Sequence, residues 1–295
     1  MNTSPQQTAS AYYDANPGTR WLRWALGLSE RVWPALAVRG ALRLFGTPLP
    51  PKWLYRRQPA LGSWRAETWA FEDASLTLYQ PPPGPHGPLV LLLHGWGGHA
   101  AQMLPLAEAL AQRGLRPLLV DLPAHGRSQG RTSNLPQFAR AIEYLTARLQ
   151  QQGHEVRGVV AHSLAANALA YAAARGLPVA RIALLAPPAS PYEYTRLFAK
   201  VFGLSERTRA GLQQRVEARE GILMRQFEPA AVGPRVASPT LIVHDREDRI
   251  NRFADAEAYR DAIRGARLIE TSGLGHTRLL RDAAVSAAVA GHMQG

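Results

Sequence analysis

The feature that most constrains the fold is a repeated alternation of short apolar runs and helical segments that begins at residue 88. The first run, PLVLLLHG, has no polar residue before His94, and an unbroken Leu/Val run is typical of a strand covered on both faces. Helical periodicity follows, and further apolar strands are expected at 116–121, 156–162, 181–186, 240–244 and 267–270, with helices at about 100–113 and 135–152. This order predicts a doubly wound, mostly parallel α/β sheet.

Two shorter stretches precede this region. Residues 66–71 and 75–79 alternate polar and apolar side chains, and prolines at 48–51 and 81–88 bracket them. Alternation with period two between turn residues is typical of half-buried strands. We therefore expect an antiparallel hairpin at one edge of the sheet.

The segment 20–45 combines tryptophan and leucine with five arginines and is interrupted at Pro34. This composition predicts two amphipathic helices. They could rest on the protein with their arginines in water, or contact an anionic membrane. The first 20 residues do not resemble a secretory signal, and no apolar stretch is long enough to span a bilayer. We expect a cytoplasmic protein, either free or in peripheral contact with a membrane.

The charge balance points towards anionic partners. The 295-residue chain has 34 Lys+Arg against 22 Asp+Glu, a formal net charge of +12, and only Lys52 and Lys200 are lysines. An anionic membrane or an acidic carrier protein fits this excess, whereas nucleic acid is disfavoured because no recognition fold accompanies the charge. The chain has no cysteine, which excludes disulfides, thiolate metal sites and a cysteine nucleophile.

Candidate functional residues follow the expected strands, where ligands bind in open α/β sheets. The segments are HGWGG at 94–98, DLPAHGRS at 121–128 and AHSLA at 161–165. Ser163 lies between a strand and an alanine-rich helix, which suits a nucleophile on a tight turn, although an ordinary N-cap is the alternative. Alanine occupies positions 161 and 165, where such a turn usually has glycine. His94 and His162 are expected to form local hydrogen bonds.

Together with HDREDRI at 244–250 and GLGH at 273–276, these segments resemble the motifs of the α/β-hydrolase superfamily, in the same order, from about residue 64 to the carboxyl end. The resemblance implies that Ser163 is the nucleophile, Asp248 the acid and His276 the general base. It assigns the oxyanion donors to the backbone N–H groups of Trp96 and Leu164. Asp245 is the alternative acid.

An insertion at 189–236 separates two core strands and is expected to form a helical lid above the catalytic edge. Its apolar side chains could line an acyl pocket or form the lid's own core. These candidates are Tyr192, Tyr194, Phe198, Phe202, Leu223, Met224 and Phe227. The expected organisation is an N-terminal helical extension at 1–60, a hydrolase core at 61–188 and 237–295, and the lid at 189–236.

The sequence thus predicts a serine hydrolase that cleaves small-molecule carboxylic esters or thioesters through an acyl-enzyme. No cofactor or metal is expected, because the chain has neither His-Glu-x-x-His nor the carboxylate spacing of a calcium loop. Acyl transfer, amide hydrolysis and perhydrolysis use the same triad and remain open. A different class of protein, a ligand-binding module that retains the fold without catalysis, is the further alternative.

Overall fold

A computed structural model of the chain describes residues 17–49, 61–82 and 87–295, with side chains from residue 21 onwards. The expectations for residues 1–16, including the absence of a secretory signal, and for 50–60 lie outside the described residues. None of the helices in the described part is long and apolar enough to cross a membrane.

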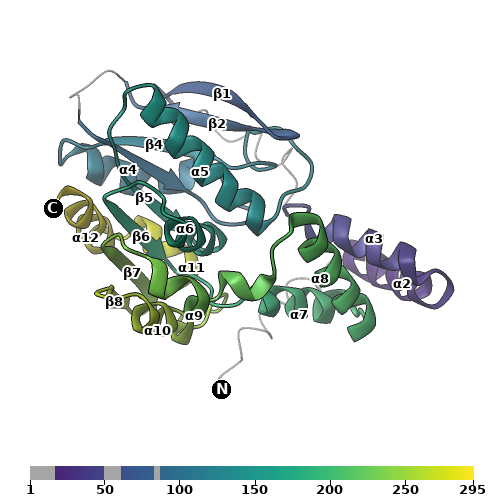
Figure 1. Ribbon diagram of the computed structural model, residues 1–295. Coiled ribbons are helices and arrows are strands. Elements are labelled where there is room, and N and C mark those ends of the chain that lie inside the picture. The colour runs from purple at the N-terminus through teal and green to yellow at the C-terminus, as the bar shows by residue number, and fades with distance from the viewer. Residues whose placement is uncertain (1–16, 50–60, 83–86) are drawn as a thin grey trace.

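The described residues form one sheet of eight strands (Figure 1). In chain order these are β1 (Arg65–Phe71), β2 (Ala74–Gln80), β3 (Leu89–Leu93), β4 (Arg116–Asp121), β5 (Val156–His162), β6 (Arg181–Leu185), β7 (Thr240–Asp245) and β8 (Arg267–Thr271). Their order across the sheet is β1-β2-β4-β3-β5-β6-β7-β8. The β1–β2 and β2–β4 pairs are antiparallel and all the others are parallel. The predicted edge hairpin and parallel sheet are confirmed.

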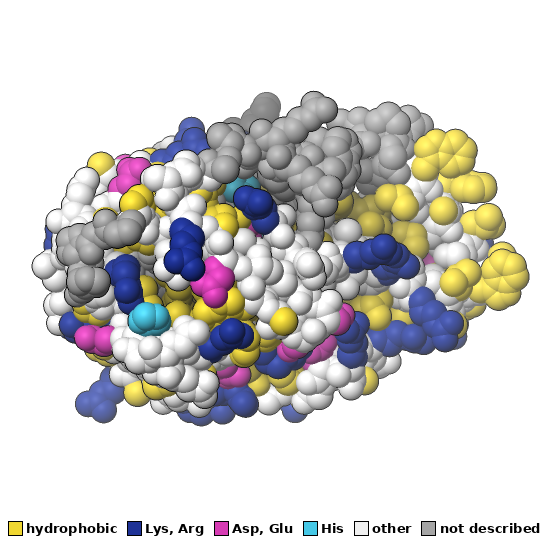
Figure 2. Space-filling model, turned by 90° about the horizontal axis from the view of Figure 1, so that it is seen from above, with side chains coloured by type: hydrophobic (Ala, Val, Ile, Leu, Met, Phe, Trp, Pro, Cys, Tyr) yellow, Lys and Arg dark blue, Asp and Glu magenta, His cyan; other side chains and the backbone are white. Residues whose placement is uncertain are grey.

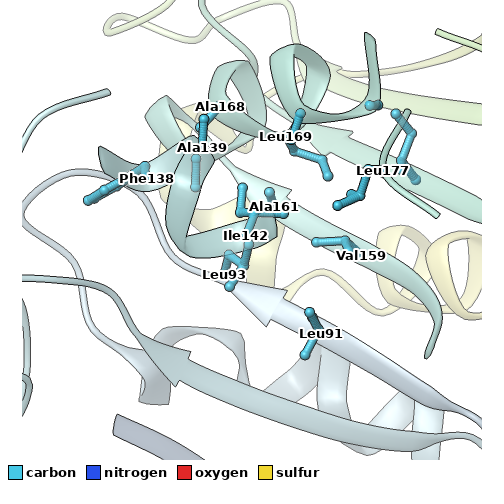
Figure 3. Packing of buried hydrophobic residues seen from close by; sticks show 14 of the residues in the cluster. Leu91, Leu93, Phe138, Ala139, Ile142, Val159, Ala161, Ala168, Leu169 and Leu177 are labelled. Atoms are coloured by element: carbon cyan, nitrogen blue, oxygen red, sulfur yellow. The ribbon is translucent and has the colours of Figure 1, made fainter. Parts of the chain in front are cut away.

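Helices cover both faces of the sheet, which explains why the strand at residue 88 has no polar alternation. In β3, Leu91 and Leu93 belong to one buried cluster, whereas Val90 and Leu92 belong to the other. The first cluster includes α5 (Leu135–Gln151), α6 (Leu164–Ala174) and α10 (Phe253–Ala262), and the second includes α4 (Leu104–Ala111) and α12 (Ala283–Gln294). Figure 3 shows Leu91, Leu93 and residues of β5 facing side chains of α5 and α6.

Side-chain hydrogen bonds cap the first turns of two helices. Asn134 accepts a hydrogen bond from the N–H of Gln137 at the start of α5, and Asp282 does the same for Val285 at the start of α12.

The short elements between the longer helices and strands are η2 (Ala100–Met103), η3 (Met224–Phe227), α9 (Pro229–Val232), η4 (Gly233–Arg235), α11 (Gly275–Arg278) and η5 (Leu279–Arg281).

Four helices lie together at one end of the molecule. They are α2 (Pro17–Val32) and α3 (Pro34–Phe45) from the N-terminal segment, and α7 (Pro191–Phe202) and α8 (Glu206–Glu220) from the insertion. The predicted pair of N-terminal helices separated at Pro34 is confirmed. Figure 1 shows the purple α2–α3 hairpin beside the green α7 and α8, away from the sheet. We call these four helices the cap.

Small apolar clusters hold the cap together. Leu26 of α2 packs with Val201 and Phe202 of α7, and Ala41 of α3 packs with Leu212 of α8. The sequence presented the N-terminal extension and the insertion as separate segments, whereas their helices share buried side chains in the structure. Their association depends on contacts between residues more than 150 positions apart, which hydrophobic periodicity within each segment does not reveal.

Candidate active site

Ser163 lies on a sharp turn between β5 and α6. Its backbone has φ 54° and ψ −125°, a conformation that costs a non-glycine residue strain and persists only when neighbouring contacts enforce it. The Ser163 N–H donates to the carbonyl of Leu185, at 2.8 Å. A Cβ atom at Gly95 would lie 2.8 Å from the Cβ of Ser163, so only glycine allows the loop after β3 to approach so closely.

The two alanines of the turn do not carry its strain. Among the described residues other than glycine, positive φ values occur at Ser163, Ala124, Ala186 and Glu72, and not at Ala161 or Ala165. Ala161 and Ala165 are both fully buried. These positions therefore require a small side chain rather than the backbone freedom of glycine, and alanine meets that requirement.

The structure brings together Ser163, His276 and Asp248 from three separate loops. The Oγ atom of Ser163 lies 3.0 Å from Nε2 of His276, and Nδ1 of His276 lies 2.7 Å from Oδ2 of Asp248. Ser163 and Asp248 are buried and His276 is partly buried. In this arrangement Nδ1–H donates to the carboxylate, which leaves Nε2 free to accept the serine proton.

The surroundings of Asp248 keep its carboxylate ionised. Burial alone would raise its pKa, but hydrogen bonds from His244 and His276 and from the N–H of Ile250 outweigh burial and hold the pKa well below its usual value. Oδ1 accepts the N–H groups of Ile250 and Asn251 at 2.7 and 3.1 Å, and Nε2 of His244 lies 3.3 Å from Oδ2. The carboxylate is therefore both fixed in orientation and charged.

Asp245, the alternative acid, occupies a different place. Its Oδ1 accepts the N–H of Glu247 at 2.9 Å, and its Oδ2 accepts the Thr271 hydroxyl at 2.8 Å and the N–H of Leu274 at 2.9 Å. Burial raises the pKa of Asp245, but the hydrogen bonds of Gly275, Leu274 and the neighbouring groups lower it by more. The pKa of Asp245 is therefore below its usual value. Asp245 thus anchors the loop that carries His276 and makes no hydrogen bond to the imidazole itself.

The loop 94–98 is held in place by buried polar contacts. His94 donates from Nδ1 to the carbonyl of Gly95 at 2.7 Å and accepts the N–H of Leu122 at 3.1 Å, as expected from the sequence. Burial lowers the pKa of His94, which favours this neutral form. Asp121 accepts the N–H of Ala100 at 2.7 Å, and the N–H of Gly97 donates to Nε2 of His125 at 3.0 Å.

The N–H groups of Trp96 and Leu164 are available at this end of the sheet. Neither donates a backbone hydrogen bond to another residue in the described part of the chain, and both residues border the same cavity. Leu164 is the first residue of α6, where N–H groups have no partner within the helix and the helix dipole favours negative charge. Both groups therefore remain candidates for binding an oxygen anion.

His162 forms a hydrogen bond with the backbone of His276. Its Nε2 donates to the backbone carbonyl of His276 at 2.9 Å, and the two rings are 4.7 Å apart. Burial, together with the neighbouring His276, lowers the pKa of His162 to about 3. The ring therefore remains neutral at physiological pH and acts as a fixed hydrogen-bond donor.

A cavity of about 210 Å³ lies between the cap and this end of the sheet. Five of the aromatic and methionine side chains expected to line a pocket do so, namely Tyr194, Phe198, Phe202, Met224 and Phe227. Tyr192 lies outside the lining and packs in the cap cluster with Ala41 and Leu212, and Leu223 is exposed. Tyr192 thus follows the alternative in which the side chain belongs to the lid's own core, whereas Leu223 neither lines the pocket nor joins that core.

Part of the lining comes from outside the insertion and was not expected from the sequence. Leu44, Phe45 and Leu49 from the N-terminal segment and Leu135 and Pro136 from the start of α5 complete the wall, and Leu197, Val201 and Ile222 add to it from the insertion. The helical periodicity of 20–45 predicted an apolar face but gave no indication of what that face would cover.

Asn251 was also missed. The Tyr194 hydroxyl donates to its Oδ1 at 2.7 Å, and its Nδ2 donates to the carbonyl of Ala186 at 2.8 Å. Because the N–H of Asn251 also donates to Oδ1 of Asp248, Asn251 connects α7 of the cap to Asp248. The Tyr194 hydroxyl is within hydrogen-bonding reach of Ser163 as well, and burial raises its pKa, which keeps it protonated.

No cluster of three or more potential metal ligands occurs within residues 17–49, 61–82 and 87–295.

Curated relatives match only a short part of the chain. The pimeloyl-[acyl-carrier protein] methyl ester esterase of Xanthomonas campestris is 40% identical over 84 residues, which cover 28% of this chain and 33% of that protein. The protein of the same name from Xanthomonas oryzae is 41% identical over 64 residues, covering 22% and 23%. The matches thus span a third or less of the length of these relatives.

Solved structures share the fold at low sequence identity. Est1E from Butyrivibrio proteoclasticus, with ferulic acid bound, has a TM-score of 0.62 and 20% identity over 78% of this chain and 96% of its own. A bacterial membrane phospholipase A has a TM-score of 0.56 and 17% identity over 92% of this chain and 96% of its own. The latter match extends beyond residues 61–295, which make up about 80% of the chain.

A family model extends over much more of the sequence. The model of the alpha/beta hydrolase family matches residues 90–288, about two thirds of the chain. This match spans β3 to α12 and includes the loops that carry Ser163, Asp248 and His276. The strand order and the structural neighbours agree with it. The chain therefore belongs to the alpha/beta hydrolase family.

Proposed function

We propose that this protein hydrolyses carboxylic esters through an acyl-enzyme formed on Ser163. The observation that carries this proposal is the continuous hydrogen-bonded arrangement of Ser163, His276 and Asp248, directly before Leu164, which lines the apolar cavity. Serine is weakly nucleophilic at neutral pH and needs an adjacent base, and the base needs a partner that fixes its tautomer.

The reaction then has two halves. In the first, Oγ of Ser163 attacks the ester carbonyl carbon while Nε2 of His276 takes the serine proton. The tetrahedral oxyanion receives hydrogen bonds from the N–H groups of Trp96 and Leu164. When the C–O bond to the alcohol breaks, His276 returns the proton to the leaving oxygen. In the second half, water attacks the carbonyl carbon of the acyl-enzyme while His276 takes a proton from that water. When the bond between the acyl carbon and Oγ breaks, His276 returns the proton to Oγ of Ser163 and the carboxylic acid is released.

The cavity favours an apolar acyl group. Most of its lining is aliphatic or aromatic, and Trp96 and Leu164 border both the cavity and the proposed oxyanion site. An acyl chain in the cavity would place its carbonyl near Ser163. We propose that the cap acts as the lid, because α3 and α7 close the side of the cavity opposite the sheet and exclude water from the acyl chain.

The names of the relatives point to several classes of ester and do not choose between them. The curated relatives are named for a methyl ester on an acyl-carrier-protein substrate, and one structural neighbour is a phospholipase. We infer that the substrate is an acyl ester or thioester, carried by a small molecule, an acidic carrier protein or a lipid. Acyl transfer, amide hydrolysis and perhydrolysis would use the same three residues.

The test combines covalent labelling with turnover. The wild type should react with a fluorophosphonate probe and hydrolyse p-nitrophenyl butyrate, and both reactions should vanish in Ser163→Ala. His276→Ala should abolish turnover. Ser205→Ala is the control, because Ser205 caps α8 in the cap and takes no part in the site. Equal labelling of Ser163→Ala and wild type would overturn the nucleophile, and binding of acyl ligands without any turnover would favour a binding module.

A further inference from the structure

Exposed apolar side chains concentrate on the α2–α3 hairpin. In the described part of the chain nine large hydrophobic side chains are exposed, and seven of these lie between residues 21 and 36. Trp21, Trp24 and Trp33 are the most exposed, at 71%, 62% and 66%. Figure 2 shows these hydrophobic side chains gathered at one end of the molecule, with Lys and Arg side chains beside them.

These residues form a stripe at helical spacing. Trp21, Trp24, Leu28 and Val32 recur along one side of α2, and Trp33 and Leu36 continue the surface into the first turn of α3. We call these six residues the Trp face. Single exposed hydrophobic residues are normal on a protein surface, whereas a group with three tryptophans is typical of a surface that binds a protein, a membrane or a ligand.

The charge of the α2–α3 hairpin itself is mostly positive. Residues 17–49 contain five arginines and one acidic residue, Glu30. Arg31, Arg39 and Arg43 are exposed on the hairpin. Glu30 turns towards α8, where its carboxylate accepts the N–H and hydroxyl of Ser205 at 2.9 and 3.0 Å. The surface that remains therefore combines indole rings with arginines, as in helices that lie in the interface of an anionic bilayer.

The opposite side of the same hairpin faces the cavity. Leu44 and Phe45 of α3 line it directly, and Leu26 of α2 packs on Val201 and Phe202, which also line it. The hairpin packs closely on α8, because Gly211 of α8 allows α3 to approach so near that a Cβ at position 211 would lie 3.0 Å from Cγ2 of Val38. The hairpin thus presents the Trp face outwards and a cavity wall inwards.

We propose that the Trp face docks this protein on anionic lipid bilayers and that the cavity takes the acyl chain of an ester held in that bilayer. The second part rests on the proposed function; the docking does not. Tryptophan inserts its ring at the level of the lipid headgroups, and arginine adds attraction to anionic headgroups. An acidic carrier protein would be recognised by the arginines without the tryptophans, and a second copy of the chain would cover the tryptophans without anionic lipid.

The test uses the full-length chain with vesicles of phosphatidylcholine alone or with one third phosphatidylglycerol. We expect co-sedimentation and a blue shift of tryptophan fluorescence with the anionic vesicles at low salt. The variant W21A/W24A/W33A should lose sedimentation at least tenfold, and R31Q/R39Q/R43Q roughly a hundredfold. The control is L223A/I250A, which removes two exposed hydrophobic residues elsewhere and should sediment like the wild type.

A second readout separates the docking from the chemistry. Hydrolysis of soluble p-nitrophenyl butyrate should be unchanged in the tryptophan and arginine variants, whereas release of fatty acid from ester lipids in anionic vesicles should fall in parallel with sedimentation. A wild type that ignores both kinds of vesicle overturns the docking, and its activity on the soluble ester still tests the proposed function. A dimer that dissociates in W21A/W24A/W33A, without vesicle binding, overturns the docking in favour of self-association. Docking with cleavage of p-nitrophenyl butyrate but no release of fatty acid from the vesicle lipids refutes the substrate inference alone, whereas docking without cleavage of either ester also refutes the proposed function.

Discussion

At the scale of single residues, the strain at Ser163 depends on small neighbours. The turn after β5 holds a positive φ at the serine itself, and Gly95, Ala161 and Ala165 leave the space in which that turn fits. Replacement of glycine by alanine at 161 and 165 is therefore no argument against a reactive serine. Among the described alanines, a positive φ occurs at Ala124, in the loop after β4, and at Ala186, directly after β6.

This distribution of φ values predicts different outcomes for two alanine to glycine changes. Ala161→Gly loses methyl burial and gains chain entropy in the unfolded state, so it should lower the free energy of unfolding by about 1–2 kcal/mol. Ala124→Gly has similar losses but relieves about 1–2 kcal/mol of left-handed strain, so its stability should stay close to wild type. Urea unfolding measures both. Higher ester hydrolysis in Ala161→Gly would contradict our account of this turn.

The two carboxylates after β7 provide a second prediction. Asp248→Asn should lower kcat by about 10³–10⁴-fold. The amide neither fixes the tautomer of the His276 ring nor stabilises the positive charge that His276 acquires when it takes the serine proton. Asp245→Asn should act mainly on stability, at about 1–3 kcal/mol, because it weakens the hydrogen bonds that anchor the His276 loop. Steady-state kinetics and urea unfolding of both variants separate these effects. A larger loss of kcat in Asp245→Asn would exchange the two roles.

At the scale of elements, the α2–α3 hairpin shares buried side chains with α7 and α8. Its inner side is buried against α7 and α8, and its outer side bears the Trp face. Leu26 and Leu28, two positions apart on α2, represent these sides, since Leu26 is buried and Leu28 is exposed. A pair of leucines on one helix thus offers a matched comparison.

We expect Leu26→Ala to loosen the hairpin from α7, at a cost of about 2–4 kcal/mol to local packing. Hydrogen exchange of α2, α3 and α7 should accelerate, and the preference for longer over shorter acyl esters should decrease because one cavity wall moves. Leu28→Ala should leave both measurements unchanged. Equal exchange in the two variants would show that the hairpin is not held by this cluster.

At the scale of the whole molecule, buried neutral histidines connect stability to pH. His162 has a pKa of about 3 in the folded protein against about 6.5 when exposed. Protonation therefore favours the unfolded chain. The stability that His162 contributes is complete above its unfolded pKa and decreases as pH falls towards its folded pKa.

The free energy of unfolding should fall by about 2 kcal/mol between pH 7 and pH 5 through His162 alone. Buried His94, whose pKa is also lowered, adds to this loss. His162→Gln keeps an N–H donor but cannot be protonated in this range, so its curve should be less steep. Chemical denaturation at several pH values measures both proteins, and their difference cancels the contributions of all other groups. Parallel curves would show that His162 is not neutralised by burial.

The sequence by itself determined the parallel sheet, the edge hairpin and the order of the loops that carry Ser163, Asp248 and His276. Those features depend on local periodicity and on residues next to strand ends, which a single chain displays directly. Only the tertiary structure decided that Asp248 and not Asp245 faces His276, that Asn251 links the acid to Tyr194, and that α2 and α3 join α7 and α8 over the cavity. These relations depend on side-chain directions and on contacts between distant segments, and burial sets them only after the sheet has assembled.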